Sequence, residues 1–87
     1  MLNFYASVGH DSRIGRYAIL SPYATVNGFS TLGEEVFLGS HVTVTAGRTL
    51  GDGVRVSANL AVHRDVPPRT LVYGASPKQA SIFAPEG

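Results

Sequence analysis

Aliphatic residues recur at every sixth position through most of the chain. Eleven such positions follow one another without a miss: Leu2, Val8, Ile14, Leu20, Val26, Leu32, Leu38, Val44, Leu50, Val56 and Val62. A small or aliphatic residue follows each of them four positions later, except at Arg48. A period of six fits neither the 3.6 residues of a helical turn nor the two-residue alternation of a simple strand. The pattern predicts short strands joined by regular bends, each strand with one inward aliphatic side chain.

Three hexads make a coil of eighteen residues, so residues eighteen apart should stack at the inter-strand spacing of about 4.8 Å. This predicts an all-β fold, a parallel β-helix of three to four coils. We expect the register to run unbroken from residue 2 to residue 66. Gly and Asn, which tolerate unusual backbone angles, are expected where the chain turns.

The hexad rhythm stops at Pro67 and Pro68, which have no N–H to donate to a strand ladder. One more strand is expected at residues 70–73. The interpretation is a β-helix domain over residues 1–75 and a short, loose C-terminal tail over residues 76–87. The opposite end of the core, near Leu2 with Phe4 and Tyr5, has no evident cover, so we expect a partner subunit or another domain to cover it.

Composition narrows the class of protein. The 87 residues suffice for one domain. The net charge is +1, which does not favour nucleic-acid binding. The sequence has no Cys, no signal-like N-terminus and no apolar run long enough to span a bilayer. We expect a cytoplasmic protein that binds neither nucleic acid nor a membrane.

Several motifs resemble the hexapeptide-repeat acyltransferases, whose fold is a left-handed parallel β-helix. The segment from His10 to Tyr17, followed by Ala24-Thr25-Val26-Asn27-Gly28, is similar to sugar O- and N-acetyltransferases that modify sialic acids or nucleotide-linked amino sugars. The stretch 63–68 and the later Val72-Tyr73-Gly74 resemble their closing segment. The resemblance covers residues 2–78.

This resemblance implies acetyl-CoA as co-substrate, a sugar or nucleotide-sugar acceptor and a homotrimer with active sites between subunits. Members of the subgroup usually carry an N-terminal nucleotide-sugar domain, whereas this chain starts at the solenoid. We therefore expect most of the usual acceptor site to be absent. The polar residue that the subgroup places nine positions after its catalytic histidine is Ile19 here.

The chemistry of acyl transfer points to His10. The reaction needs a base for the acceptor and donors for the developing oxyanion. Eighteen-residue stacking places Gly28, Ala46 and Arg64 above His10, so this column is almost free of side chains and offers a path for the pantetheine arm. Gly28 N–H is the expected oxyanion donor. Asp11 either stabilises charged His10 or is a solvated turn carboxylate, and the sequence leaves both open.

Other residues complete the predicted site. Donor-binding positions are assigned to Ile19, Gly28, Ser40, Ala46, Ala58, Arg64 and Lys78, with Arg64 and Lys78 as phosphate contacts. His41 stacks in an outward column with Tyr5, Tyr23 and Asn59 and is expected at the surface or at a subunit contact. His63 is expected to have a structural or CoA-proximal role, and no metal is expected.

Two functions from different classes follow. The first is an acetyl-CoA-dependent acetyltransferase that acts on a hydroxyl or amine of a sugar, with His10 as general base and Asp11 beside it. The alternative is a non-catalytic trimeric assembly or binding module that has lost its acceptor domain.

Overall fold

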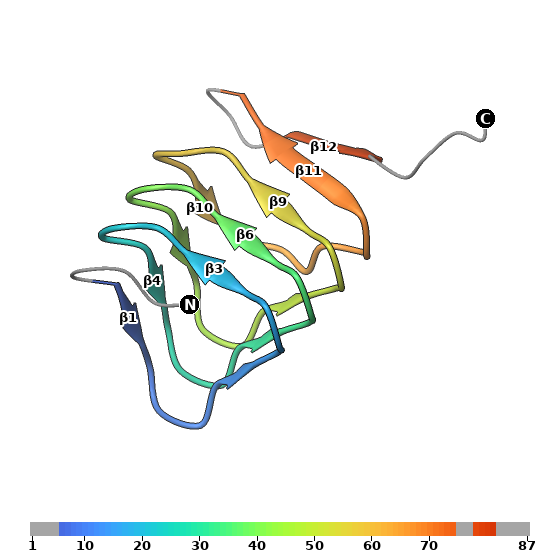
Figure 1. Cartoon of the computed structure of the whole chain (residues 1–87). Coiled ribbons are helices and arrows are strands. Elements are labelled where there is room, and N and C mark those ends of the chain that lie inside the picture. Colours follow the sequence, from blue (N-terminus) through green and yellow to red (C-terminus); the bar gives the residue numbers. More distant parts are fainter. Residues whose placement is uncertain (1–5, 75–77, 82–87) are drawn as a thin grey trace.

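The computed structural model describes residues 6–74 and 78–81, which form a three-sided solenoid built from strands (Figure 1). Face one contains β1 (Ser7–Val8), β4 (Thr25–Val26), β7 (Thr43–Val44) and β10 (Ala61–Val62). Face two contains β2 (Arg13–Ile14), β5 (Thr31–Leu32) and β8 (Thr49–Leu50). Face three contains β3 (Ile19–Leu20), β6 (Phe37–Leu38), β9 (Arg55–Val56), β11 (Thr70–Tyr73) and β12 (Lys78–Ser81).

The predicted stacking register is confirmed. Parallel pairing joins Val8 to Val26 on face one and Ile14 to Leu32 on face two, each eighteen residues apart. Leu20 pairs with Leu38 in the same way on face three. The fold is the left-handed parallel β-helix, with about four coils.

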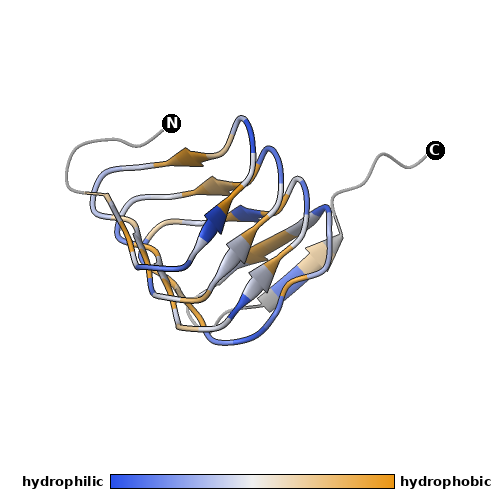
Figure 2. Cartoon of the chain, turned by 90° about the horizontal axis from the view of Figure 1, so that it is seen from below, coloured by the Kyte–Doolittle hydropathy of each residue, from blue (hydrophilic) through white to orange (hydrophobic). Residues whose placement is uncertain are grey.

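The inward positions of the hexads form the core. The central aliphatic residues are wholly buried, including Leu20, Val26, Leu38, Val44 and Leu50. In the first coil Val8 and Ile14 are only partly buried, since they lie toward the end of the described stack. The hydrophobic stretches recur at matching places in successive coils (Figure 2). Burial of these columns therefore supplies the main apolar stabilisation of the solenoid.

The backbone turns at one fixed position of the hexad, and residues other than Gly and Asn occupy it at most bends. The left-handed residue of each bend comes three positions after the inward aliphatic residue, with φ between 55° and 74°. These residues are Asp11, Tyr17, Tyr23, Phe29, Glu35, His41, Gly47, Gly53, Asn59 and Arg69. Most of them are neither Gly nor Asn, so the expectation that those residue types mark the turns is wrong at most bends. The repeated stacking of the coils holds even aromatic residues in this conformation, which L-residues adopt at a cost.

The glycines directly after the inward aliphatic residues have another purpose. None of Gly9, Gly15 or Gly33 has a positive φ, yet a Cβ on any of them would meet atoms of the next coil. On Gly15 it would lie 2.5 Å from the backbone C and O of Gly33. These glycines are needed because neighbouring coils approach closely here.

The expected unbroken register fails at the last coil. Val66 bridges to Leu50, sixteen residues away, and Val72 pairs with Val56 at the same shortened separation. Val62 still pairs with Val44 at eighteen, so the chain loses two residues between Val62 and Val66. Val66 thus takes the inward place on face two rather than the small corner position that the sequence pattern predicted.

The C-terminal part is only partly as expected. The predicted strand at residues 70–73 is confirmed as β11. Residues 78–81 of the predicted loose tail instead form β12, which pairs antiparallel with β11 from Thr70↔Ser81 to Tyr73↔Lys78. The predicted N-terminal opening at Leu2, Phe4 and Tyr5, and the rest of the tail, lie outside the described residues. Within the described part of the chain, no helix has the length and apolar character that a membrane crossing requires.

Candidate functional site

The predicted column above His10 lies along one edge of the solenoid. We call this edge the first corner; it joins face one to face two and comprises residues 9–12, 27–30, 45–48 and 63–65. Phe29 N–H donates to His10 O, and Gly47 N–H donates to Gly28 O, so the coils stack here as the sequence predicted. From the coil of His10 to that of Arg64 are three inter-strand steps, or about 14 Å.

His10 and Asp11 form a contact that the sequence left open. His10 Nδ1 lies 3.2 Å from Asp11 Oδ2, and the two side chains are 79% and 69% exposed. Neighbouring residues of a strand would point to opposite faces. Here the chain turns at His10 and Asp11, and Asp11 has a φ of 58°. The bend therefore brings the carboxylate to the imidazole, and an Nδ1–H tautomer that donates to Asp11 leaves Nε2 as an acceptor.

Gly28 lies against the other side of the imidazole. A Cβ placed on Gly28 would be 3.7 Å from His10 Nε2 and 3.1 Å from His10 O. No described residue accepts a hydrogen bond from Gly28 N–H. The absence of a side chain at Gly28 thus leaves the backbone of this coil open beside Nε2.

Comparison with the equivalent N–H group at the next corner shows why Gly28 N–H has no described acceptor. Glu34 occupies the same hexad position as Gly28, and its N–H donates to Asp52 Oδ1 in the coil above at 2.8 Å. The residue above Gly28 is Ala46, which has no side-chain acceptor. Gly28 N–H therefore has no acceptor among the described residues.

Sequence reasoning missed Phe29 as a neighbour of His10. Its ring centroid is 5.2 Å from that of the imidazole, at an interplanar angle of 76°. Phe29 is 62% exposed and stacks on Asp11 rather than on His10 in the eighteen-residue register. The sequence could have indicated this contact, because Phe29 directly follows Gly28, the residue stacked above His10. A side chain as large as Phe can reach the neighbouring column.

A ladder of serine hydroxyls links the coils within the first corner. Ser12 Oγ donates to Asn27 O at 3.0 Å and accepts from Ser30 N–H at 3.2 Å. Ser30 Oγ repeats this one coil higher, donating to Thr45 O at 3.1 Å and accepting from Arg48 N–H at 3.3 Å. Ser30 is wholly buried, so these bonds satisfy a hydroxyl that would otherwise be costly to bury.

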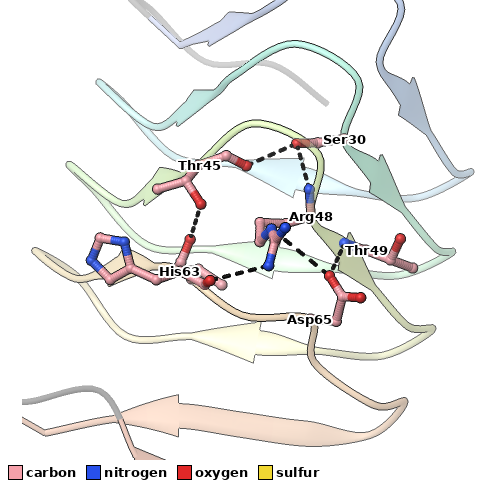
Figure 3. A network of polar contacts seen from close by, with 7 residues as sticks. Ser30, Thr45, Arg48, Thr49, His63 and Asp65 are labelled. Carbon is pink, nitrogen blue, oxygen red and sulfur yellow. Dashed lines mark hydrogen bonds and ion pairs between the residues drawn. The ribbon is translucent and has the colours of Figure 1, made fainter.

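The ladder also gives a physical account of Arg48, which the sequence pattern did not explain (Figure 3). Arg48 Nη1 donates to His63 O at 3.2 Å. This carbonyl is fifteen residues further along the chain, the same separation as between Ser12 or Ser30 and the carbonyl to which each hydroxyl donates. Asp65 Oδ1 accepts from Thr49 N–H at 2.9 Å and lies 3.9 Å from Arg48 Nε. A longer side chain thus replaces the serine where the last coil is two residues short.

A hollow of about 700 Å³ lies at the C-terminal end of the solenoid. The inward residues Val62, Val66 and Val72 line it together with His63, Arg64 and Gln79. His10 does not line it. This hollow therefore contains both Arg64, the predicted phosphate contact, and His63, predicted to be structural or close to CoA. Their segment is joined to the coil below by the hydrogen bonds of Arg48 and Asp65.

The remaining predicted donor contacts lie away from the first corner. Ile19 is on β3 of face three, and Ser40 and Ala58 are at the bend between faces three and one, where Asn59 N–H donates to Ser40 O. Lys78 begins β12. One chain therefore brings His10, Asp11, Gly28, Ala46 and Arg64 to one edge, but it does not bring Ile19, Ser40 or Ala58 there.

His41 lies away from the first corner, at the bend between faces three and one. His41 stacks on Tyr23 with ring centroids 4.9 Å apart, in the predicted outward column. Within residues 6–74 and 78–81, no three metal-ligating side chains gather into a group that could hold a metal ion. The expectation of no metal stays a prediction.

Solved structures similar to this one are acetyltransferases. A histidine-to-asparagine variant of perosamine N-acetyltransferase from Caulobacter crescentus, in complex with CoA and GDP-perosamine, is 35% identical with a TM-score of 0.85; the match covers 90% of this chain and 37% of that one. The acetyltransferase domain of PglB from Neisseria gonorrhoeae FA1090, in complex with acetyl coenzyme A, is 20% identical with a TM-score of 0.66, covering 91% and 56%. Serine acetyltransferase (CysE) from Neisseria gonorrhoeae is 19% identical with a TM-score of 0.56, covering 94% and 41%.

Sequence comparisons add no further assignment. No protein-family model matches the chain, and no curated protein sequence matches it. The chain spans between 37% and 56% of the three solved neighbours. It is a left-handed hexapeptide-repeat β-helix whose solved structural neighbours are acetyltransferases.

Proposed function

We propose that this chain is an acetyl-CoA-dependent acetyltransferase that modifies a hydroxyl or an amine of a sugar, with His10 as general base. The observation that carries the proposal is the arrangement around the imidazole. Asp11 lies at Nδ1, and the side-chain-free Gly28 lies next to Nε2. The similarity to a sugar N-acetyltransferase solved with CoA and a nucleotide sugar supports this choice of donor and acceptor.

The chemistry assigns one task to each group. His10 Nε2 takes the proton from the acceptor hydroxyl or amine as its oxygen or nitrogen attacks the thioester carbonyl. Gly28 N–H donates to the oxyanion that develops on that carbonyl. The bond to sulfur then breaks, and the CoA thiolate leaves and receives the proton from His10. Asp11 holds the imidazole and stabilises its charged form during this transfer.

The first corner provides a path for the donor. Above Gly28 the next residue of the column is Ala46, so the column carries no long side chain of its own in these two coils, and Arg64 follows in the shortened last coil. We propose that Arg64 meets the phosphates of CoA, and Lys78 stays a predicted second phosphate contact. The hydrogen bond from Arg48 to His63 O holds the segment that carries Arg64.

Donor binding tests the proposal without any knowledge of the acceptor. We expect calorimetric titration with acetyl-CoA to give saturable binding with one site per chain. GDP-perosamine then heads the panel of amino-sugar acceptors, because a neighbour was solved with it. An absence of acetyl-CoA binding would overturn the donor assignment and favour the non-catalytic trimeric module.

A homotrimer is part of the proposal. Ile19 and Tyr23 are large side chains that remain 42% and 49% exposed, on or beside face three. A neighbouring copy packed there would cover them and bring Ile19, Ser40 and Ala58 to the first corner of another chain. Sedimentation equilibrium at micromolar concentration should give three times the mass of one chain, and a monomer mass would contradict the shared site. Cytoplasmic location stays a prediction.

A further inference from the structure

We propose that Phe29 is a positioning residue for His10. The proposal rests on the proposed function, in which His10 is the base. Phe29 belongs to the coil above His10, and its ring meets the imidazole edge to face, at 5.2 Å between centroids and 76° between planes. Aromatic rings favour this geometry because the positive edge of one meets the negative face of the other.

The imidazole needs such a contact because its side chain is largely in solvent. His10 is 79% exposed, so core packing does not fix its rotamer. The Asp11 carboxylate holds Nδ1 at 3.2 Å, but one hydrogen bond still allows the ring to tilt about that point. Phe29 supplies the second contact. Together the two contacts keep Nε2 beside Gly28, where the thioester carbonyl would be bound.

The fold itself does not require an aromatic residue at this place. The same turn position of the first corner holds Asp11 one coil below and Gly47 one coil above. Phe29 has a φ of 61° and is 62% exposed, so both its backbone conformation and its apolar surface are unfavourable. Packing in the buried core does not offset either cost, because the side chain lies outside the core. The interaction that the Phe29 side chain contributes is its contact with His10.

Tyr17 provides a matched control. It occupies the same hexad position at the bend between faces two and three, also has a φ of 61°, and is 74% exposed. Glycine adopts a positive φ freely, so both Phe29→Gly and Tyr17→Gly keep the turn conformation accessible. The two variants differ in whether the lost ring lay against His10.

The test combines a spectroscopic and a kinetic measurement. NMR resonances of the His10 ring protons, assigned with a His10→Ala variant, report the ring current of Phe29. Phe29→Gly should shift them and should lower kcat for acetyl transfer to an amino-sugar acceptor about 10- to 100-fold, with little change in KM for acetyl-CoA. Phe29→Tyr, which keeps an aromatic ring at this position, should give the His10 resonances and the kcat of the parent. Tyr17→Gly should change neither the resonances nor kcat.

The outcomes separate this inference from the proposed function. Unchanged His10 resonances in Phe29→Gly would overturn the contact. Shifted resonances with a kcat equal to that of Tyr17→Gly would overturn the positioning role. A parent protein that neither binds nor consumes acetyl-CoA would overturn the proposed function and the role of Phe29 in it, while the NMR comparison would still decide whether Phe29 contacts the imidazole.

Discussion

The His10→Ala variant is expected to transfer acetyl groups about 10²- to 10⁴-fold more slowly than the parent, because a positioned general base contributes a rate factor of that size. The loss should appear in kcat. Acetyl-CoA binding should persist, since Gly28 N–H and the open column above it do not depend on the imidazole. Release of the CoA thiol with an amino-sugar acceptor measures the rate, and calorimetry measures donor binding.

His41→Ala is the control for this experiment. His41 is likewise exposed and at a bend, but it stacks on Tyr23 at a different edge of the solenoid. Its replacement should leave the transfer rate within about twofold of the parent, provided that the oligomeric state is unchanged. A His10→Ala variant as fast as the parent would remove His10 from the mechanism, whatever its effect on stability.

The fold was largely predictable because a period of six is tied to the geometry of the coil. Each inward aliphatic residue must lie over another one eighteen residues later, as Leu20 lies over Leu38, so the spacing alone specifies the pairing register. The same reasoning predicted the column from His10 through Gly28 to Arg64. The position of Gly28 above His10 follows from this stacking and is seen in the hydrogen bond from Phe29 N–H to His10 O, whereas the role of each site residue stays a prediction.

What the sequence concealed depends on contacts rather than on period. Val66 fits the small corner position of a regular hexad, and only its bridge to Leu50 reveals that the last coil is short. Arg48 breaks the pattern in sequence, yet its guanidinium makes the hydrogen bond that a serine makes in the coils below. Nor does any local pattern predict β12, whose polar residues pair with β11 only after the chain reverses.

The glycines show most clearly how a correct pattern led to a wrong physical reason. Gly is permissive of turns, so its recurrence suggested bends. The bends instead use residues such as Tyr17 and Glu35, whereas glycines such as Gly15 are required by the distance between coils. These two reasons predict opposite results for substitution by alanine.

Gly15→Ala should destabilise the protein more than Gly47→Ala, although only Gly47 has a left-handed φ. A Cβ on Gly15 would lie 2.5 Å from Gly33 C and O, and backbone atoms cannot give way without disturbing the ladder of face two. Overpacking of this kind costs about 3 kcal/mol. A Cβ on Gly47, with φ of 74°, meets nothing within 4 Å, so its cost is the conformational strain of about 1 kcal/mol.

Denaturant unfolding of the two variants and the parent measures both costs as changes in the free energy of unfolding. The contrast is independent of any catalytic role, since neither glycine contacts His10 in the described structure. If Gly47→Ala proved the more harmful, the turn would limit the stability of the hexad after all. Gly15→Ala as the more harmful change would mean that close stacking of the coils, which also brings the Gly28 backbone against His10, is what the repeated glycines preserve.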